Sequence, residues 1–265
     1  MNILFWNLKR NSNIEEIISN LIVDNDVDIF LCSEFHSVDF DNLITMLKNE
    51  YVVLADTDTC EKIKVIFKKG TLISMLRAQH RSLTMKLTVH EQDILLVGVH
   101  LSPNPTSTSD VRKYEIRDIM TDIDSDEQFV FGENKHRSMV IGDMNANPFD
   151  SEMVNKDSFN AVLFKDIIEQ SDTVVFEKEE FERFYNPALD YINENNKNYG
   201  SFYYSSGIGC LYWYCYDQVL LRKDLINHFV SMDYIKEIGE AKLINRIAPN
   251  KSISDHLPLL VKMDI

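Results

Sequence analysis

Hydrophobic residues recur along the chain at spacings that predict strands alternating with helices. Weak alternation from Asn2 to Asn7 and a mostly apolar run over 27–32 predict two strands, the second of a kind usually buried. A helix between them is predicted by apolar residues at helical spacing, namely Ile14, Ile17, Ile18, Leu21 and Ile22. Ser12 and Glu15 have the spacing of a capping box at its start.

The middle of the chain predicts short strands followed by a charged region. A helix is expected at 39–49, and strands are expected at 51–55, 63–67, 71–76, 82–89 and 93–100. Prolines predict a loop over 101–105, and a helix is then expected from Val111, Tyr114, Ile116, Ile119 and Ile123. The charged residues 124–137 predict a surface linker that leads to a strand at 138–141.

The second half of the chain is less regular. A helix is expected near 159–169, and the asparagine-rich stretch 193–198 favours an irregular excursion over 172–200. Aromatic strands are predicted at 202–204 and 211–216, running into 217–221, and a final strand at 257–263 follows helical or irregular chain over 223–240. Neither repeats nor a composition shift divide the chain, so one domain over 1–265 is expected.

Composition excludes several classes of protein. The 265 residues are 45% hydrophobic and 26% charged, as is ordinary for a globular protein. There is no run of eighteen apolar residues, so no membrane span is expected. The start of the chain has the pattern of a strand and not of a signal peptide, which predicts a cytoplasmic protein. Four cysteines without paired spacing argue against a zinc knuckle or a disulfide framework.

The net charge of −15 limits how the protein can bind nucleic acid. The chain has 42 acidic residues against 27 basic ones. Phosphate neutralisation drives most non-specific affinity for DNA, so this balance argues against tight duplex binding. It leaves room for a local basic groove, and it also fits an enzyme that acts on small phosphorylated molecules.

Polar residues end several of the apolar runs, and this is the pattern that points to chemistry. They are Asn7, Glu34, His100, Asp143 with Asn145, Asp217, and Asp255 with His256. Each one alone is explained as a turn, a cap or a surface residue. Together they predict a site, because open sheets bind ligands where strand ends converge.

The residue types in this set suit phosphoester cleavage. Gly142 is expected to let the backbone turn, after which Asp143 and Asn145 would share one face if the chain stays extended. A carboxylate can orient or deprotonate water, and an amide can hold a phosphate oxygen.

The same set predicts a divalent metal and a polarised histidine. Glu34, Asp255 and Asn7 supply the hard oxygen ligands that Mg²⁺ or Mn²⁺ prefers. Histidines without a neighbouring cysteine argue against zinc. His256 can contact a phosphoryl oxygen, with Asp217 orienting its ring.

These motifs resemble the endonuclease/exonuclease/phosphatase superfamily, the fold of pancreatic-type deoxyribonuclease. The matching segments, in the family's order, are Phe5-Trp6-Asn7, Leu31-Cys32-Ser33-Glu34, Val99-His100-Leu101, Ile141-Gly142-Asp143-Met144-Asn145, Asp217-Gln218-Val219 and Ser254-Asp255-His256. The resemblance implies a four-layer α/β sandwich, with two packed mixed β-sheets flanked by helices. It also implies metal-dependent hydrolysis of a phosphoric ester.

The resemblance assigns a role to each residue of the set. It implies that Glu34 is the main metal ligand, helped by Asn7 and Asp255. Asp143 resembles the residue that acts on water, Asn145 a phosphate ligand, and His256 the phosphate-contacting histidine paired with Asp217. His100 matches a histidine of the deoxyribonuclease and sphingomyelinase branches, and Glu61 is a loose counterpart of its glutamate partner. Gln218 departs from the His or Tyr often found there.

Three functions remain open from the sequence, and a nuclease for DNA or RNA is preferred. Arg112, Lys113 and Arg117 would then contact phosphates or else form a solvated helix face. The aromatic residues of 203–216 would stack bases or else pair across a hairpin. The alternatives are a phosphatase or phosphodiesterase for a small molecule or lipid headgroup, and a binding module without activity.

Overall fold

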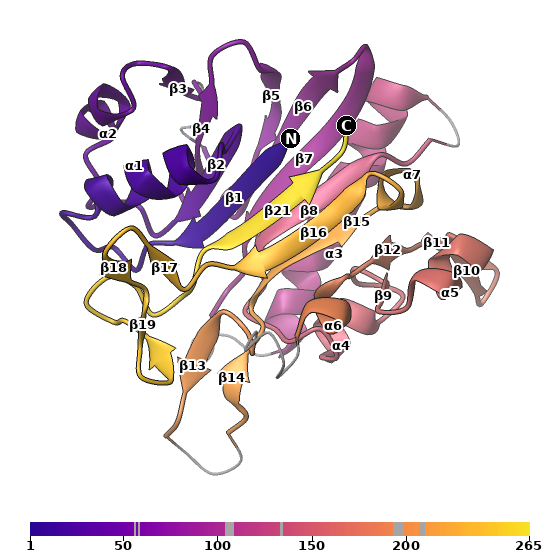
Figure 1. Cartoon of the computed structure of the whole chain (residues 1–265). Helices are drawn as coiled ribbons and strands as arrows, with labels where there is room; N and C mark the ends of the chain where they lie inside the picture. Colours follow the sequence, from indigo (N-terminus) through magenta and orange to yellow (C-terminus); the bar gives the residue numbers. More distant parts are fainter. Residues whose placement is uncertain (56, 58, 104–108, 133–134, 193–198, 207–209) are drawn as a thin grey trace.

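The computed structural model describes residues 1–55, 57, 59–103, 109–132, 135–192, 199–206 and 210–265. They form two large β-sheets, one of six strands and one of seven, with helices outside them (Figure 1). The four-layer α/β sandwich expected from the sequence is therefore confirmed. Two predictions concern residues outside the described ones: the Asn104-Pro105 part of the loop and the asparagine-rich stretch 193–198.

The first sheet contains both ends of the chain. Its strands, in spatial order, are β16 (Phe229–Tyr234), β21 (Leu259–Met263), β1 (Asn2–Asn7), β2 (Ile29–Ser33), β4 (Lys64–Lys68) and β3 (Tyr51–Val53). β1 is parallel to β2 and antiparallel to β21. The predicted first and last strands therefore lie side by side, which brings Asn7 to the same end of the sheet as the segment before β21.

The second sheet contains the central polar motifs. Its strands, in spatial order, are β5 (Leu72–Ala78), β6 (Ser82–Val89), β7 (Gln92–His100), β8 (Ser138–Asp143), β15 (Asp217–Leu221), β12 (Phe184–Tyr185) and β9 (Ala161–Val162). β8 lies parallel to β7, with His100 opposite Asp143, and antiparallel to β15, with Asp217 opposite Asp143. Three predicted site residues are thus neighbours across the sheet.

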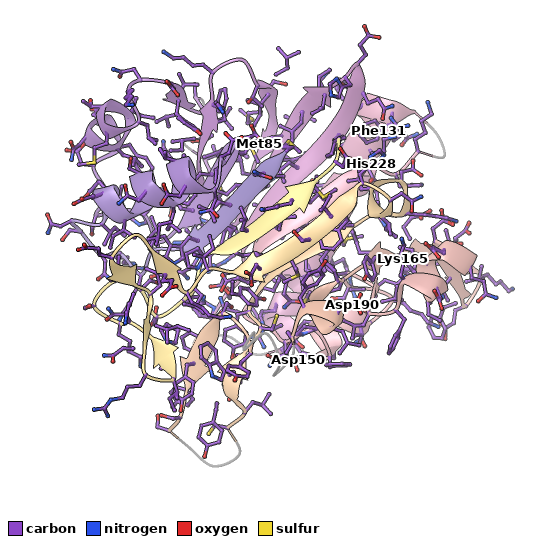
Figure 2. The ribbon with its side chains drawn as sticks, viewed as in Figure 1. Met85, Phe131, Asp150, Lys165, Asp190 and His228 are labelled. Atoms are coloured by element: carbon purple, nitrogen blue, oxygen red, sulfur yellow. The ribbon has the colours of Figure 1, made fainter. Side chains whose placement is uncertain are left out.

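Apolar side chains hold the layers together. One buried cluster includes residues of both sheets, and a second lies between the seven-stranded sheet and α3 (Ser109–Phe131). A Cβ added at Gly98 would lie 2.8 Å from the Leu31 side chain, so the two sheets approach closely at β7. Figure 2 shows the side chains over the ribbon, and Figure 1 shows α1 (Glu15–Asp24) and α2 (Phe40–Met46) covering the six-stranded sheet.

The prediction of a surface linker at 124–137 is wrong, because α3 continues through Phe131. Two of its acidic residues are buried and paired: Asp126 pairs with Arg77, and Glu127 pairs with Arg222 and His136. The buried face of α3 also differs from the predicted one. Val111 and Tyr114 are exposed, whereas Arg112 is buried against Glu152.

Three other local predictions need correction. The expected helix near 159–169 is β9 followed by a shorter α5 (Lys165–Gln170), and the excursion over 172–200 contains an ordered hairpin of β10 (Thr173–Phe176) and β11 (Glu179–Glu182). Residues 223–240 contain α7 (Lys223–Ile226) and the strand β16, which pairs with β21. The capping box is not formed, because Glu15 accepts a hydrogen bond from the Asp39 backbone N–H instead.

Small elements lie around the ends of the large sheets. They are α4 (Ser151–Val154), α6 (Ala188–Tyr191), β13 (Phe202–Tyr204), β14 (Tyr212–Tyr214), β17 (Glu237–Ile238), β18 (Ala241–Lys242), β19 (Ile244–Asn245) and β20 (Ala248–Pro249). Asp150, Lys165 and Asp190 mark the region of α4–α6 in Figure 2. Across the described residues, no helix is long and apolar enough to cross a membrane.

Candidate active site

A pocket of about 530 Å³ opens where strands of both sheets end. It is lined by Asn7, Lys9, Glu34, His100, Pro103, Asp143, Asn145, Phe202, Tyr204, Tyr214, Tyr216, Asp255 and His256. Seven of the eight residues predicted from strand ends are in this list, and the eighth, Asp217, lies directly behind His256. The structure therefore brings the whole predicted set together.

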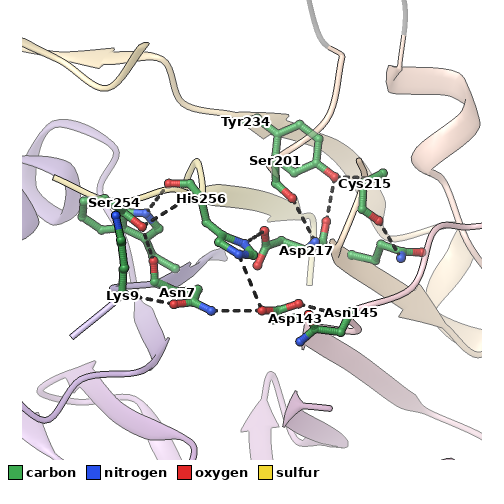
Figure 3. Close-up of polar contacts among 12 residues, drawn as sticks. Asn7, Lys9, Asp143, Asn145, Ser201, Cys215, Asp217, Tyr234, Ser254 and His256 are labelled. Atoms are coloured by element: carbon green, nitrogen blue, oxygen red, sulfur yellow. Dashed lines mark hydrogen bonds and ion pairs between the residues drawn. The ribbon is translucent and has the colours of Figure 1, made fainter. Parts of the chain in front are cut away.

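Asp143 is the centre of the polar contacts (Figure 3). Its Oδ2 accepts a hydrogen bond of 3.0 Å from Asn7 Nδ2. The Nε2 atoms of His100 and His256 lie 3.6 and 3.9 Å from the same oxygen. Only 1% of Asp143 is exposed, so one buried carboxylate is surrounded by groups that can donate to it.

The backbone around Asp143 differs from the predicted geometry. Gly142 does not turn, because β8 stays extended to Asp143, but a Cβ at Gly142 would lie 1.9 Å from the Val99 carbonyl oxygen. Glycine is thus required by close strand contact. The extended chain then ends, since Asn145 has a φ of 47°. The Asn145 N–H donates to Asp143 Oδ1 and its Nδ2 donates to the Leu101 carbonyl, which fix both side chains.

His256 and Asp217 form a buried pair. Nδ1 of His256 donates to Asp217 Oδ2 over 2.7 Å. Burial opposes a positive charge on the imidazole, but the carboxylates of Asp217 and Asp143 outweigh it and raise the pKa of His256 to about 10. His256 is therefore cationic near neutral pH. Ser201 Oγ accepts from the Asp217 N–H, and Tyr234 donates to the Asp217 carbonyl, so the backbone of Asp217 is held on both sides.

His100 lies on the other side of Asp143 and has a different charge state. Burial lowers the pKa of His100, and the nearby carboxylates of Asp143 and Glu34 offset only part of that effect. Its Nδ1 has no hydrogen-bond partner among the described residues. A neutral and a cationic imidazole thus lie on either side of one aspartate.

The residues predicted to bind a metal fit a hard divalent cation. Glu34 follows the last residue of β2 with a φ of 50°, an uncommon backbone conformation for a residue that lines the pocket. Its carboxylate is 29% exposed, and Arg10 and His100 lie at 3.8 and 3.9 Å, so neither forms a short hydrogen bond with it. Asp255 and Asn7 add oxygens to the same pocket. Carboxylate and amide oxygens are the donors that Mg²⁺ and Mn²⁺ prefer.

A second group of ligand atoms is a weaker metal site. One atom each of Asp143, Asp217 and His256 lie within 4.8 Å of one another. However, Asp217 is fully buried and its Oδ2 already accepts from His256. A cation there would compete with the buried ion pair and would not contact the pocket through Asp217.

Two features of the pocket were not assigned to it from the sequence. Lys9 lines the pocket two residues after Asn7, and its N–H donates to Asn7 Oδ1. Phe202 packs against the His256 ring at 4.9 Å and begins an aromatic wall completed by Tyr204, Tyr214 and Tyr216. The aromatic pattern of 202–216 was visible in the sequence, but its place beside His256 depends on the tertiary fold.

Other basic and acidic residues considered from the sequence lie elsewhere. Glu61 pairs with His80 at 3.5 Å at the surface and is not a partner of His100. Arg112 is buried and paired with Glu152. Lys113 and Arg117 pair with Asp110 and Asp157. None of these lines the pocket, so they do not supply a phosphate-binding face there.

Known structures share this architecture. No protein-family model and no curated protein sequence matches the chain. D. rerio TDP2, humanized by 14 mutations, is 14% identical with a TM-score of 0.62 over 100% of this chain and 99% of the other. The same enzyme complexed with single strand DNA product is 13% identical, with a TM-score of 0.59 over 100% and 99%.

Two bacterial structures extend the comparison. A mannosyl-6-phosphatase from Bacteroides thetaiotaomicron is 10% identical with a TM-score of 0.59 over 99% of both chains. An endonuclease/exonuclease/phosphatase family protein from Leptotrichia buccalis is 14% identical with a TM-score of 0.58 over 100% of both chains. At these identities the comparison establishes the fold alone, and that fold is shared with a structure described as an endonuclease/exonuclease/phosphatase family protein.

Proposed function

We propose that this chain, which has the fold of the endonuclease/exonuclease/phosphatase superfamily, is a divalent-metal-dependent phosphodiesterase that cleaves nucleic acid. The observation that carries the proposal is the arrangement around Asp143. One buried carboxylate faces a pocket between a neutral histidine and a cationic one, with the carboxylates of Glu34 and Asp255 in the same pocket. Acid–base groups and hard metal ligands together are what hydrolysis of a phosphoric ester needs.

The residues suggest a division of tasks in an in-line attack of water on phosphorus. Asp143 orients the water and accepts its proton as the new P–O bond forms and the bond to the leaving oxygen breaks. His256, held as a cation by Asp217, donates a hydrogen bond to a phosphoryl oxygen, and His100 and the remaining Asn145 N–H contact the others. When bound by Glu34, Asn7 and Asp255, a Mg²⁺ or Mn²⁺ ion supplies charge neutralisation for the phosphate and the leaving group.

A phosphatase for a small molecule is the second candidate. The pocket is of a size usual for small ligands, about 530 Å³, and the aromatic wall closes one side of it. The mannosyl-6-phosphatase among the similar structures also supports this reading.

A panel of substrates tests both functions. The purified protein would be incubated with Mg²⁺ or Mn²⁺ and single- and double-stranded DNA, RNA, nucleotides, inositol phosphates, sugar phosphates and a choline phospholipid. Asp143→Asn is the blank, because it removes the charge while keeping the shape. We expect metal-dependent cleavage of a nucleic acid that the blank lacks. Equal activity of the blank would refute the role of Asp143, and cleavage of only a small phosphoester would favour the phosphatase.

A further inference from the structure

A second groove lies behind the aromatic hairpin that walls the active site. It has a volume of about 690 Å³ and is lined by Tyr199, Trp213, Lys236, Glu237, Lys242, Ile244, Arg246 and Ile247. Three of its side chains are basic and one is acidic, in a chain whose net charge is −15. The local charge is therefore opposite to that of the molecule as a whole.

The groove and the active site share one wall. β13 and β14 pair with Tyr203 opposite Trp213 and Phe202 opposite Tyr214. Because neighbouring side chains of a strand point to opposite faces, Tyr214 lines the active-site pocket while Trp213 lines the groove. The pocket and the groove therefore lie on opposite faces of one hairpin.

The backbone of this wall is fixed to Asp217, the residue that pairs with His256. A Cβ at Gly200 would lie 2.5 Å from the Tyr214 carbonyl oxygen, so only glycine allows the chain to run against β14 here. The next residue, Ser201, donates its N–H to that carbonyl and accepts from the Asp217 N–H with its Oγ. Tyr199 in the groove is thus two residues from a contact that holds Asp217.

The chemistry of the groove combines stacking surface with positive charge. The rings of Tyr199 and Trp213 lie 5.9 Å apart, and Tyr203 packs on Trp213 at 5.5 Å. Lys242 and Arg246 are exposed and form no ion pair with any residue that the structure describes. Both are supported by short strand pairs, since β17 pairs with β18 and β19 with β20, and β20 packs against β13. The basic groups are therefore presented by ordered chain beside the rings.

We propose that this groove binds the part of a single-stranded nucleic acid that extends beyond the scissile phosphate. Aromatic rings that stack bases, next to cations that follow the backbone, are how single strands are held without sequence preference. A duplex keeps its bases stacked on one another, so it offers no base to Trp213. The inference rests on the proposed nuclease function, because it extends the substrate of that same site.

Binding measured by fluorescence anisotropy tests the groove. Labelled single-stranded oligonucleotides of DNA and RNA would be titrated with the Asp143→Asn protein in Mg²⁺, so that they stay intact. Adding Lys242→Gln with Arg246→Gln should weaken binding about tenfold and flatten the dependence of log affinity on log salt by about 1.4. Trp213→Leu should weaken binding about tenfold through lost stacking.

A matched control separates a local effect from a change in net charge. Lys48→Gln with Lys69→Gln removes the same charge from exposed positions next to α2 and β4, on the side of the molecule away from β13 and β14 (Figure 1). This pair should leave binding unchanged. Equal loss in the control, no binding by the parent protein, or duplex binding that depends equally on Lys242 and Arg246 would overturn the proposal.

Hydrolysis of a small diester keeps this test distinct from that of the proposed function. With Asp143 intact, both groove variants should cleave bis(p-nitrophenyl) phosphate at the parental rate, which also shows that they are folded. An unmodified protein that cleaves neither this diester nor any substrate of the panel would refute the proposed function. If both groove variants bound oligonucleotides as tightly as the parent protein, the proposed role of the groove would be refuted instead.

Discussion

The two ends of the β8–β15 strand pair both contain buried charge, and they use it differently. At one end, Asp143 lies opposite Asp217, and both contact His256 beside an open pocket. At the other end, Arg222 donates its N–H to the Ser138 carbonyl, and its guanidinium pairs with Asp124 and Glu127. The same two strands thus hold a candidate catalytic cluster and a second ionic cluster.

The difference lies in what faces the charges. The second cluster is covered by α3, and the ring of Phe184 stacks 4.1 Å from the Arg222 Cζ atom. His136 and Ser138 complete it by contacting Glu127. At the first end the pocket takes the place of the covering helix. Buried charge alone is therefore not enough to propose a functional site, and our proposal rests on buried charge that opens to a pocket.

The largest expected effect is on catalysis at the first end. Asp143→Asn should lower the turnover rate on the best substrate of the panel by about 10³-fold, since general-base contributions are of order 10²–10⁴. Steady-state kinetics would measure it, with Asp233→Asn on the exposed side of β16 as the control. A loss of less than tenfold would remove Asp143 from the mechanism.

At the second end the expected effect is on stability. Arg222→Met leaves buried Glu127 with His136 as its remaining basic partner and should lower the free energy of unfolding by about 3–5 kcal/mol. Urea denaturation would measure this, and turnover per folded molecule should not change. Arg222→Lys keeps the charge and should lose less. If Arg222→Met instead lowered turnover and not stability, the two ends would not differ as described.

An intermediate effect is expected from the positioning residue Asp217. Asp217→Asn keeps the size of the side chain but removes the negative charge that orients the His256 ring and keeps it protonated. We therefore expect kcat to fall about 10²-fold. KM should change little, because Asp217 does not line the pocket. A matching loss of the downfield Nδ1 proton resonance of His256 in NMR spectra would link the defect to the ring. Unchanged kcat would show that Asp217 is only structural.

The smallest effect concerns pH and the second cluster. A hydrogen bond with Glu127 raises the pKa of His136, with help from the charge of Glu182. Protonated His136 therefore stabilises the fold fully below the unfolded pKa of about 6.5, and this contribution is lost as pH rises through the folded value. The difference in unfolding free energy between the parent and His136→Gln should be larger at pH 6 than at pH 9. If this difference in unfolding free energy did not change with pH, the raised pKa of His136 would be contradicted.

The strand ends of the site could be predicted from the sequence because they depend on local pattern. Apolar runs interrupted by Asn7, Glu34 or His100 mark strand ends, and the sheet then brings these ends together. The predictions that were wrong concern features that depend on pairing between residues far apart in the sequence. The acidic residues of 124–131 have the pattern of a linker until Arg77 and Arg222, distant in sequence, neutralise Asp126 and Glu127. Likewise β16 is recognisable as a strand only beside β21.

The pocket also contains features that could be predicted from local sequence and features that could not. Asp143 and Asn145 were found, but the reason for their placement was wrong, because a left-handed Asn145 and not an extended chain directs the second side chain. Lys9 carries no sequence signal that separates it from a surface lysine. The aromatic wall could be seen as aromatic, but which ring faces His256 is decided by hairpin register.

The hydroxyl of Ser254 has a consequence for how the protein becomes active. It donates to the Asn7 carbonyl over 2.7 Å and accepts from the His256 N–H, while Trp6 donates to the His256 carbonyl. These contacts join residues about 250 positions apart, so they form only after the segment around Ser254 and His256 has left the ribosome. A nascent chain that ends before Ser254 has most of both sheets but no assembled site. The candidate site would then be assembled only after the segment that contains Ser254 and His256 has been made.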